Sequence, residues 1–213
     1  VINKTPVDFL KNLAIDVHSF FNGFSKRYNK QWHPLFIGAE RGSLPLCEHV
    51  VERTGDINPK RPMDGFTPFG FAAQEGHLEI CAFLIKQLRH KIPSEKDGWT
   101  PLHHAAQKGH LEVCKAIMMH LRNKNPASND GFTPLHLAAQ QGHFEISKLL
   151  FENLDDKNPG CHMGWTPFHY AAKYGHLEIC KELLENLDNK NPGNYSGVIP
   201  LHVAASKGQL IVA

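Results

Sequence analysis

Histidine and cysteine are the residues of this sequence best suited to metal binding or nucleophilic chemistry. The 213 residues include 15 His and 5 Cys. Most of the histidines recur at two positions, one after Pro-Leu or Pro-Phe and one after Gly: His103, His136, His169 and His202, and His77, His110, His143 and His176. Packed helices lie about 8–10 Å apart, too far for histidines of neighbouring copies to share a zinc ion with bonds of about 2 Å. We therefore expect structural histidines and no metal site.

Four of the five cysteines also recur at one position, which holds Ser147 in the remaining copy: Cys47, Cys81, Cys114 and Cys180. A small residue that recurs beside aliphatic residues indicates a buried packing position. Cys161 lies outside this series, between Gly160 and His162, and an exposed, reactive thiol is the alternative for this residue alone. An odd number of cysteines argues against a closed set of disulfides and favours a reducing, cytoplasmic compartment.

Overall composition excludes several classes of function. Lys and Arg number 23 and Asp and Glu number 21, so the chain is not a polycation and a nucleic-acid binder is disfavoured. No apolar run approaches the roughly 18 residues that cross a bilayer, so direct membrane insertion is not expected. The sequence has no Cys-x-x-Cys, no Gly-rich phosphate loop and no nucleophile–base–acid arrangement. We expect a non-enzymatic protein that needs no cofactor.

These residues belong to a tandem repeat. Copies begin at Asp64, Asp97, Asp130, Met163 and Ser196, a constant spacing of 33 residues, and a weaker copy precedes them from residue 31. Within residues 129–161, Thr133 and Pro134 predict the start of a short inner helix and Gly142 its end. A second helix follows, with its apolar residues three to four positions apart, and a Pro-Gly loop, here called a finger, leads to the next copy.

The repeat resembles the ankyrin repeat. The residues that carry the resemblance are Gly-x-Thr-Pro-Leu-His at 98–103 and 131–136 and Ala-Ala-x-x-Gly-His-Leu-Glu at 105–112 and 171–178. It implies an all-α solenoid of helix–turn–helix units with short β-hairpin fingers. The repeats span 31–62, 63–95, 96–128, 129–161, 162–194 and a truncated 195–213. Gly70 departs from the pattern, because it stands where the four later copies have His, which the first copy also lacks.

Both ends of the sequence differ from the repeat. Residues 1–30 do not match it, and apolar residues at helical spacing predict an amphipathic helix over about 6–22. We interpret this helix as a cap on the stack, and the alternative is part of an upstream domain or a partner-binding helix. The sixth copy stops about one turn into its second helix, so we expect the natural protein to continue.

The resemblance implies that a partner protein binds the concave face, where the variable positions lie. An aromatic residue lies near the start of most copies, and polar residues precede the Gly that ends the inner helix. Met163 and Tyr174 differ most from the residues at the same positions of the other copies. The candidate residues are Trp32, Phe66, Trp99, Phe132, Trp165, Lys108, Gln141, Tyr174 and Met163. The alternative for the aromatic residues is that their rings pack within the repeat and do not bind a partner. We expect a monomeric scaffold or adaptor; the alternatives are a regulatory segment acting in cis within a larger enzyme or channel, and an enzyme.

The resemblance also implies a modification. Ankyrin-type fingers are substrates of an asparaginyl hydroxylase at an Asn that follows Asp and an aliphatic residue. Asn58, in Asp56-Ile57-Asn58, matches this context best, and Asn158 is the second candidate.

Overall fold

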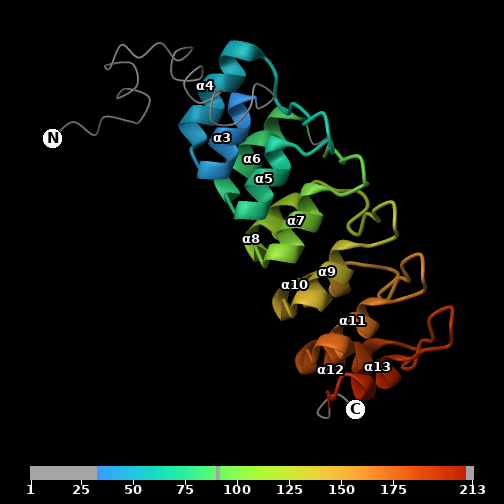
Figure 1. Ribbon diagram of the computed structural model, residues 1–213. Coiled ribbons are helices and arrows are strands. Elements are labelled where there is room, and N and C mark those ends of the chain that lie inside the picture. Colours follow the sequence, from blue (N-terminus) through green and yellow to red (C-terminus); the bar gives the residue numbers. More distant parts are fainter. Residues whose placement is uncertain (1–32, 90–91, 210–213) are drawn as a thin grey trace.

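The computed structural model describes residues 33–89 and 92–209, and the expected helix at 6–22 lies outside them, as does Trp32. Eleven helices occur in the described ranges. Ten of them form five inner–outer pairs that follow one another along a stack, and α13 is the inner helix of the last repeat (Figure 1). The inner helices are α3 (Pro34–Arg41), α5 (Pro68–Glu75), α7 (Pro101–Lys108), α9 (Pro134–Gln141), α11 (Pro167–Tyr174) and α13 (Pro200–Ser206). The outer helices are α4 (Leu44–Thr54), α6 (Leu78–Gln87), α8 (Leu111–Met118), α10 (Phe144–Glu152) and α12 (Leu177–Asn186).

Local sequence explains where the inner helices begin and end. In α9, Thr133 is the N-cap, Pro134 occupies the first turn, and the His136 side chain accepts a hydrogen bond from the Thr133 backbone N–H. Gly142 ends the helix in the left-handed region, at φ 80°, where a side chain would be strained. These features confirm the expected helix boundaries in this repeat.

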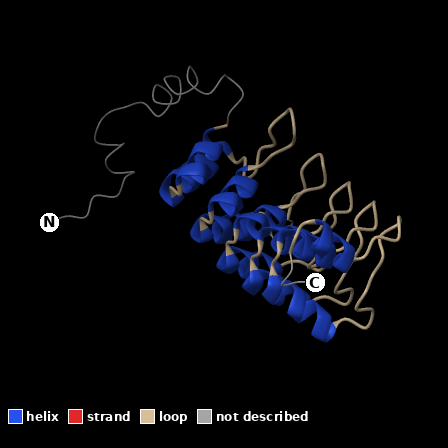
Figure 2. Cartoon of the chain, turned by 60° about the horizontal axis from the view of Figure 1, so that its bottom comes forward, coloured by secondary structure: helices blue, strands red, loops and turns tan. Residues whose placement is uncertain are grey.

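The fingers run from each outer helix to the next inner helix and project from one side of the stack (Figure 2). Each tip is closed by a backbone hydrogen bond, as from Ser128 N–H to the Phe132 carbonyl at 2.7 Å, and is joined to the preceding finger, as from Asn129 N–H to the Asp97 carbonyl at 2.7 Å. None of the fingers forms a β-strand within the described residues. The expected hairpins are therefore tight turns, because the two backbone bonds within each tip are too few for a strand ladder.

The core lies between the helices of successive repeats. Pairs of alanines on the inner helices, such as Ala105 and Ala106, are fully buried and let neighbouring helices approach closely. The cysteines of the recurring position are buried and free, as expected. Two clusters of buried apolar residues meet at α9, where Ala138 belongs to one cluster and Ala139 to the other.

Candidate protein-binding face

Two sets of histidines hold the repeats together. His136 illustrates the first set: its Nε2–H donates to the Trp165 carbonyl of the next finger at 3.0 Å, and its Nδ1 accepts from Thr133. His143 illustrates the second: its Nε2 lies 3.1 Å from the Gln107 carbonyl, at the end of the preceding inner helix. The expectation of structural histidines is thus confirmed for His103, His136 and His169 and for the second set, whereas His202 is exposed and makes no such bond within the described residues. The geometry also assigns His136 the Nε2–H tautomer, because Nε2 faces an acceptor and Nδ1 faces a donor.

Burial favours the neutral form of three histidines of the first set, His103, His136 and His169. Desolvation lowers the pKa of both His103 and His136 to about 4, against the smaller, opposite effect of their hydrogen bonds to backbone carbonyls. Burial also lowers the pKa of His169. A neutral imidazole is what the site requires, because a proton on Nδ1 would point at the N–H of the preceding Thr.

We call the surface formed by the finger tips, the aromatic rings behind them and the C-terminal ends of the inner helices the finger face. Its rings, Phe66, Trp99, Phe132 and Trp165, are half-buried. Trp99 lies 5.5 Å from His103 and 5.1 Å from His104, measured between ring centroids. Trp165 lies 5.4 Å from His169 and 5.4 Å from Tyr170. Each ring therefore packs against inner helices and presents only part of its surface to a partner.

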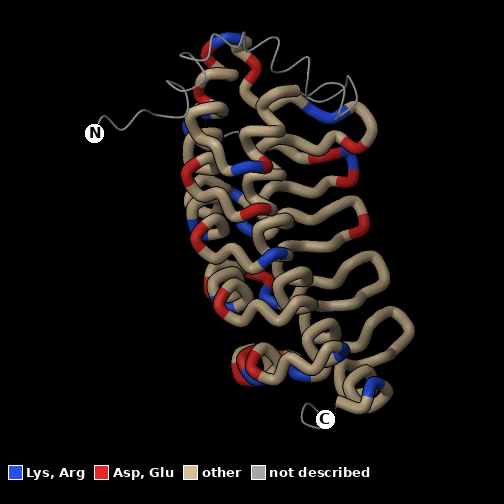
Figure 3. The backbone as a smooth tube through the Cα atoms, turned by 60° about the vertical axis from the view of Figure 1, so that its left-hand side comes forward, with Lys and Arg blue, Asp and Glu red and all other residues tan. Residues whose placement is uncertain are grey.

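The other candidate residues are exposed. Lys108 and Gln141 end their inner helices in solvent, and Tyr174 is 44% exposed. Met163, at a finger tip, is 70% exposed. Lys173 lies over two rings, with its Nζ 5.6 Å from the Trp165 centroid and 5.2 Å from that of Tyr174. Apolar and aromatic surface is therefore exposed at the C-terminal end of the finger face, where the tips carry no charged residue (Figure 3).

The two hydroxylation candidates serve the same structural purpose. The side-chain carbonyl of Asn58 accepts a hydrogen bond from the Phe69 backbone N–H at 3.2 Å, and that of Asn158 accepts one from Phe168 N–H at 3.3 Å. Asn125 does the same in its repeat. Each Asn thus satisfies a free N–H in the first turn of an inner helix.

Cys161 is buried, at 4% exposed, so the alternative of an exposed reactive thiol is wrong. Its backbone N–H closes the finger by donating to the Trp165 carbonyl at 2.8 Å. Its side chain is turned inward toward Tyr170, whose pKa is raised mainly by burial and further by Cys161.

A buried pair that the sequence analysis missed lies between the second and third repeats. His104 Nε2 is 2.9 Å from Glu95 Oε1, and the two side chains are 7% and 5% exposed. The pair occupies space next to Gly70, because a Cβ on this glycine would lie 2.8 Å from Glu95 Oε1 and 3.5 Å from the His104 ring. The replacement of the repeat's usual His by Gly70 was the signal in the sequence that could have indicated this pair.

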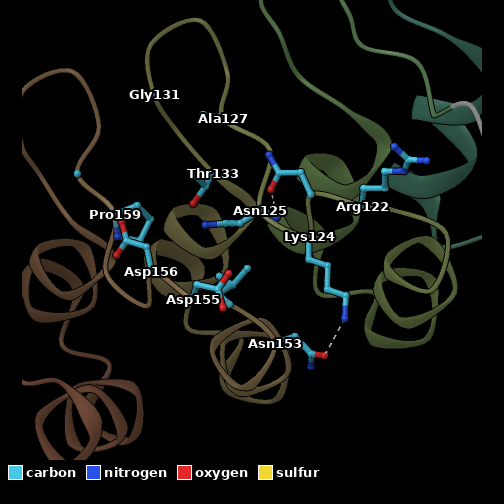
Figure 4. Close-up of a pocket in the computed structure, with 13 residues that line it drawn as sticks. Arg122, Lys124, Asn125, Ala127, Gly131, Thr133, Asn153, Asp155, Asp156 and Pro159 are labelled. Carbon is cyan, nitrogen blue, oxygen red and sulfur yellow. Dashed lines mark hydrogen bonds between the residues drawn. The ribbon is translucent and has the colours of Figure 1, made fainter.

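An open cavity of about 440 Å³ lies between the bases of two neighbouring fingers. Figure 4 shows Lys124 directed at Asn153, whose Oδ1 is 3.2 Å from Lys124 Nζ, with Asp155 and Asp156 on the facing loop. Across the described ranges, no group of three or more His, Cys, Asp or Glu is arranged to hold a metal ion. Nor does any described helix combine the length and apolar character needed to cross a membrane.

The capped inner helices, the outer helices packed on them and the histidine bonds from each inner helix to the next finger together define the repeat. A family model of ankyrin repeats, in three copies, matches residues 35–129, 88–160 and 152–213. The chain belongs to the ankyrin-repeat family. A search of curated proteins found no match. Ankyrin repeats generally mediate protein–protein interactions and typically act as non-catalytic modules.

Proposed function

We propose that this ankyrin-repeat chain is a non-catalytic scaffold or adaptor that binds a partner protein on its finger face. The observation that carries the proposal is the exposure of Met163 and Tyr174 on fingers and helices that buried histidines hold in place. Aromatic and Met side chains are enriched at the centres of protein interfaces. A pre-ordered surface also reduces the entropy cost of binding.

The exposed candidates are better test residues than the aromatic rings. The half-buried Trp99 and Trp165 pack on His103 and His169, so replacing them would disturb the fold as well as the surface. Met163, Tyr174 and Lys108 are exposed and can be replaced with little expected effect on stability.

The proposal is tested by affinity capture from cytosolic lysate with the whole chain. The variant Met163→Ala/Tyr174→Ala is compared with Met119→Ala, which removes an 80%-exposed methionine at the end of α8. We expect a protein that wild type and Met119→Ala capture and the double variant loses, with unchanged unfolding temperatures. Equal capture by all three proteins would show that binding lies elsewhere. Capture of nothing by the wild type would favour the alternative, a regulatory segment acting in cis.

The same proposal includes a cytoplasmic location and hydroxylation at Asn58 and Asn158. Five free thiols support the location, because they persist in a reducing compartment. Hydroxylation is tested by mass spectrometry of the protein isolated from its own cells, where the finger peptides should each carry one added oxygen. Peptides of unmodified mass would contradict it.

A further inference from the structure

The second repeat shows how a finger of this chain holds a cationic side chain. Asp64 binds the guanidinium of Arg61 through both carboxylate oxygens, with Arg61 Nε 2.8 Å from Asp64 Oδ1. The Arg61 Cζ lies 5.1 Å from the Phe66 ring centroid and 5.9 Å from that of Phe71. The guanidinium is thus held by a carboxylate at its edge and aromatic surface at its face.

Two further fingers keep the carboxylate and the ring but lack the arginine. The equivalents of Asp64 and Phe66 are Asp97 and Trp99 in the third repeat, and Asp130 and Phe132 in the fourth. Asp97 Oδ1 accepts from Trp99 N–H at 3.0 Å, as Asp64 Oδ1 accepts from Phe66 N–H at 3.0 Å. In the fourth finger the Ser128 hydroxyl accepts from Phe132 N–H instead.

The arginine is absent for a local reason. Pro62 has no N–H, so the second finger closes from Arg61 N–H to the Phe66 carbonyl and is one residue wider than the next fingers. In those fingers the closing hydrogen bond is donated by the N–H of Glu95 or Ser128. Both side chains are turned inward: Glu95 pairs with His104, and Ser128 is buried. The positions equivalent to Arg61 in the sequence hold Ser94 and Ala127, both exposed and uncharged.

No cation of the described chain takes the place of the arginine. Asp97 and Asp130 form no ion pair with another described residue, and no described Lys or Arg lies over Trp99 or Phe132. Two lysines of the second and third fingers donate to backbone carbonyls instead: Lys60 Nζ to Ser94, and Lys96 Nζ to Met63 of the preceding finger. In the fifth repeat, where Met163 replaces the Asp, Lys173 covers Trp165. The rings at the two ends of the row thus carry a cation of the chain, and the two in the middle do not.

We propose that the middle of the finger face binds two arginine side chains of the partner, one against Asp97 and Trp99 and the other against Asp130 and Phe132. Neighbouring repeats are about 8–10 Å apart. Three residues of a polyproline II segment span about 9 Å and make one full turn, so side chains three residues apart point to the same side. The partner is therefore a protein segment with arginines three residues apart, Arg-x-x-Arg, lying across the fingers. This inference names the partner of the proposed function and rests on it.

The test is a selection of random displayed peptides on the whole chain, followed by binding measurements on the recovered peptides. Asp97→Asn/Asp130→Asn removes the two charges and keeps the side-chain oxygen that accepts from Trp99 N–H in the third finger. The matched control, Glu145→Gln/Glu178→Gln, removes two exposed acids at the starts of α10 and α12. Unfolding of all proteins is measured in parallel.

We expect recovered peptides with Arg-x-x-Arg, and Asp97→Asn/Asp130→Asn should bind them about ten-fold more weakly or worse, the effect of losing charge-assisted hydrogen bonds. The control should bind them as wild type does. Peptides without basic residues that bind the Asp variant normally but lose affinity in Met163→Ala/Tyr174→Ala would overturn this inference and leave the proposed function standing. Peptides indifferent to all of these changes would contradict both.

Discussion

Lowering the pH from about 7 to about 5 should destabilise the repeat stack through His103 and His136. Each imidazole accepts at Nδ1 from the N–H of the preceding Thr and donates from Nε2 to the next finger. A second ring proton would point at the Thr N–H donor and would also charge a fully buried side chain. The proton is therefore bound more weakly in the folded protein than in the unfolded chain.

The sign and size of the effect follow from the two pKa values. In the folded protein each pKa is lowered from 6.5 to about 4, so the unfolded chain binds more protons between these values. The stabilisation is present above pH 6.5 and is lost as the pH falls through this window. At pH 5 the loss is about 2 kcal/mol for each histidine, or about 4 kcal/mol for both, a large part of the stability of an ordinary domain.

Urea unfolding followed by circular dichroism at several pH values measures this loss. His136→Gln removes one of the two histidines and should reduce the pH dependence of the free energy of unfolding by about half. The substitution also lowers stability at neutral pH. His162→Gln, at an exposed finger tip, is the control and should leave the pH dependence unchanged. A free energy of unfolding that stays constant between pH 7 and pH 5, or an unaltered slope in His136→Gln, would refute the reasoning.

Three further predictions concern single positions. Ser147→Ala should raise the free energy of unfolding in urea by about 1 kcal/mol. The Ser147 hydroxyl is buried without a hydrogen-bond partner, at the position where the other copies have Cys. A loss of stability would contradict this prediction. Gly142→Ala should lower the free energy of unfolding by about 1–3 kcal/mol more than Gly55→Ala does. Both glycines have positive φ, but only at Gly142 would the new Cβ meet a ring, 2.5 Å from His176 Cε1. Equal unfolding midpoints of the two variants would contradict this prediction. Glu95→Gln should destabilise the protein by about 1–3 kcal/mol, because His104 loses the carboxylate that it faces. A thermal midpoint equal to that of wild type would show that the pair does not stabilise the fold.

The repeat was predictable because its signals are local. Thr133, Pro134 and Gly142 specify the ends of α9 through backbone geometry that needs no distant partner. The His136 contact follows from the same regularity, because a residue repeated every 33 positions meets the same neighbour in each copy.

The features that sequence analysis missed depend on departures from the repeat. Glu95 and His104 meet only because Gly70 leaves space beside them, and neither residue alone indicates the pair. The position of Cys161 in a finger suggested exposure, but its side chain is turned toward Tyr170. Trp99 and Trp165 are partly covered by His104 and Tyr170 of their own inner helices, at a position whose residue differs from copy to copy, so the repeat pattern does not indicate it.

The central claim is that the finger face binds the partner and the outer helices do not. Site-specific photo-crosslinking tests it most directly, with the reactive group placed at Gln141 on the finger face or at Glu145 at the start of α10, both exposed. The account predicts that the captured protein is crosslinked from Gln141 and not from Glu145. Crosslinking from Glu145 alone, or equally from both positions, would contradict it.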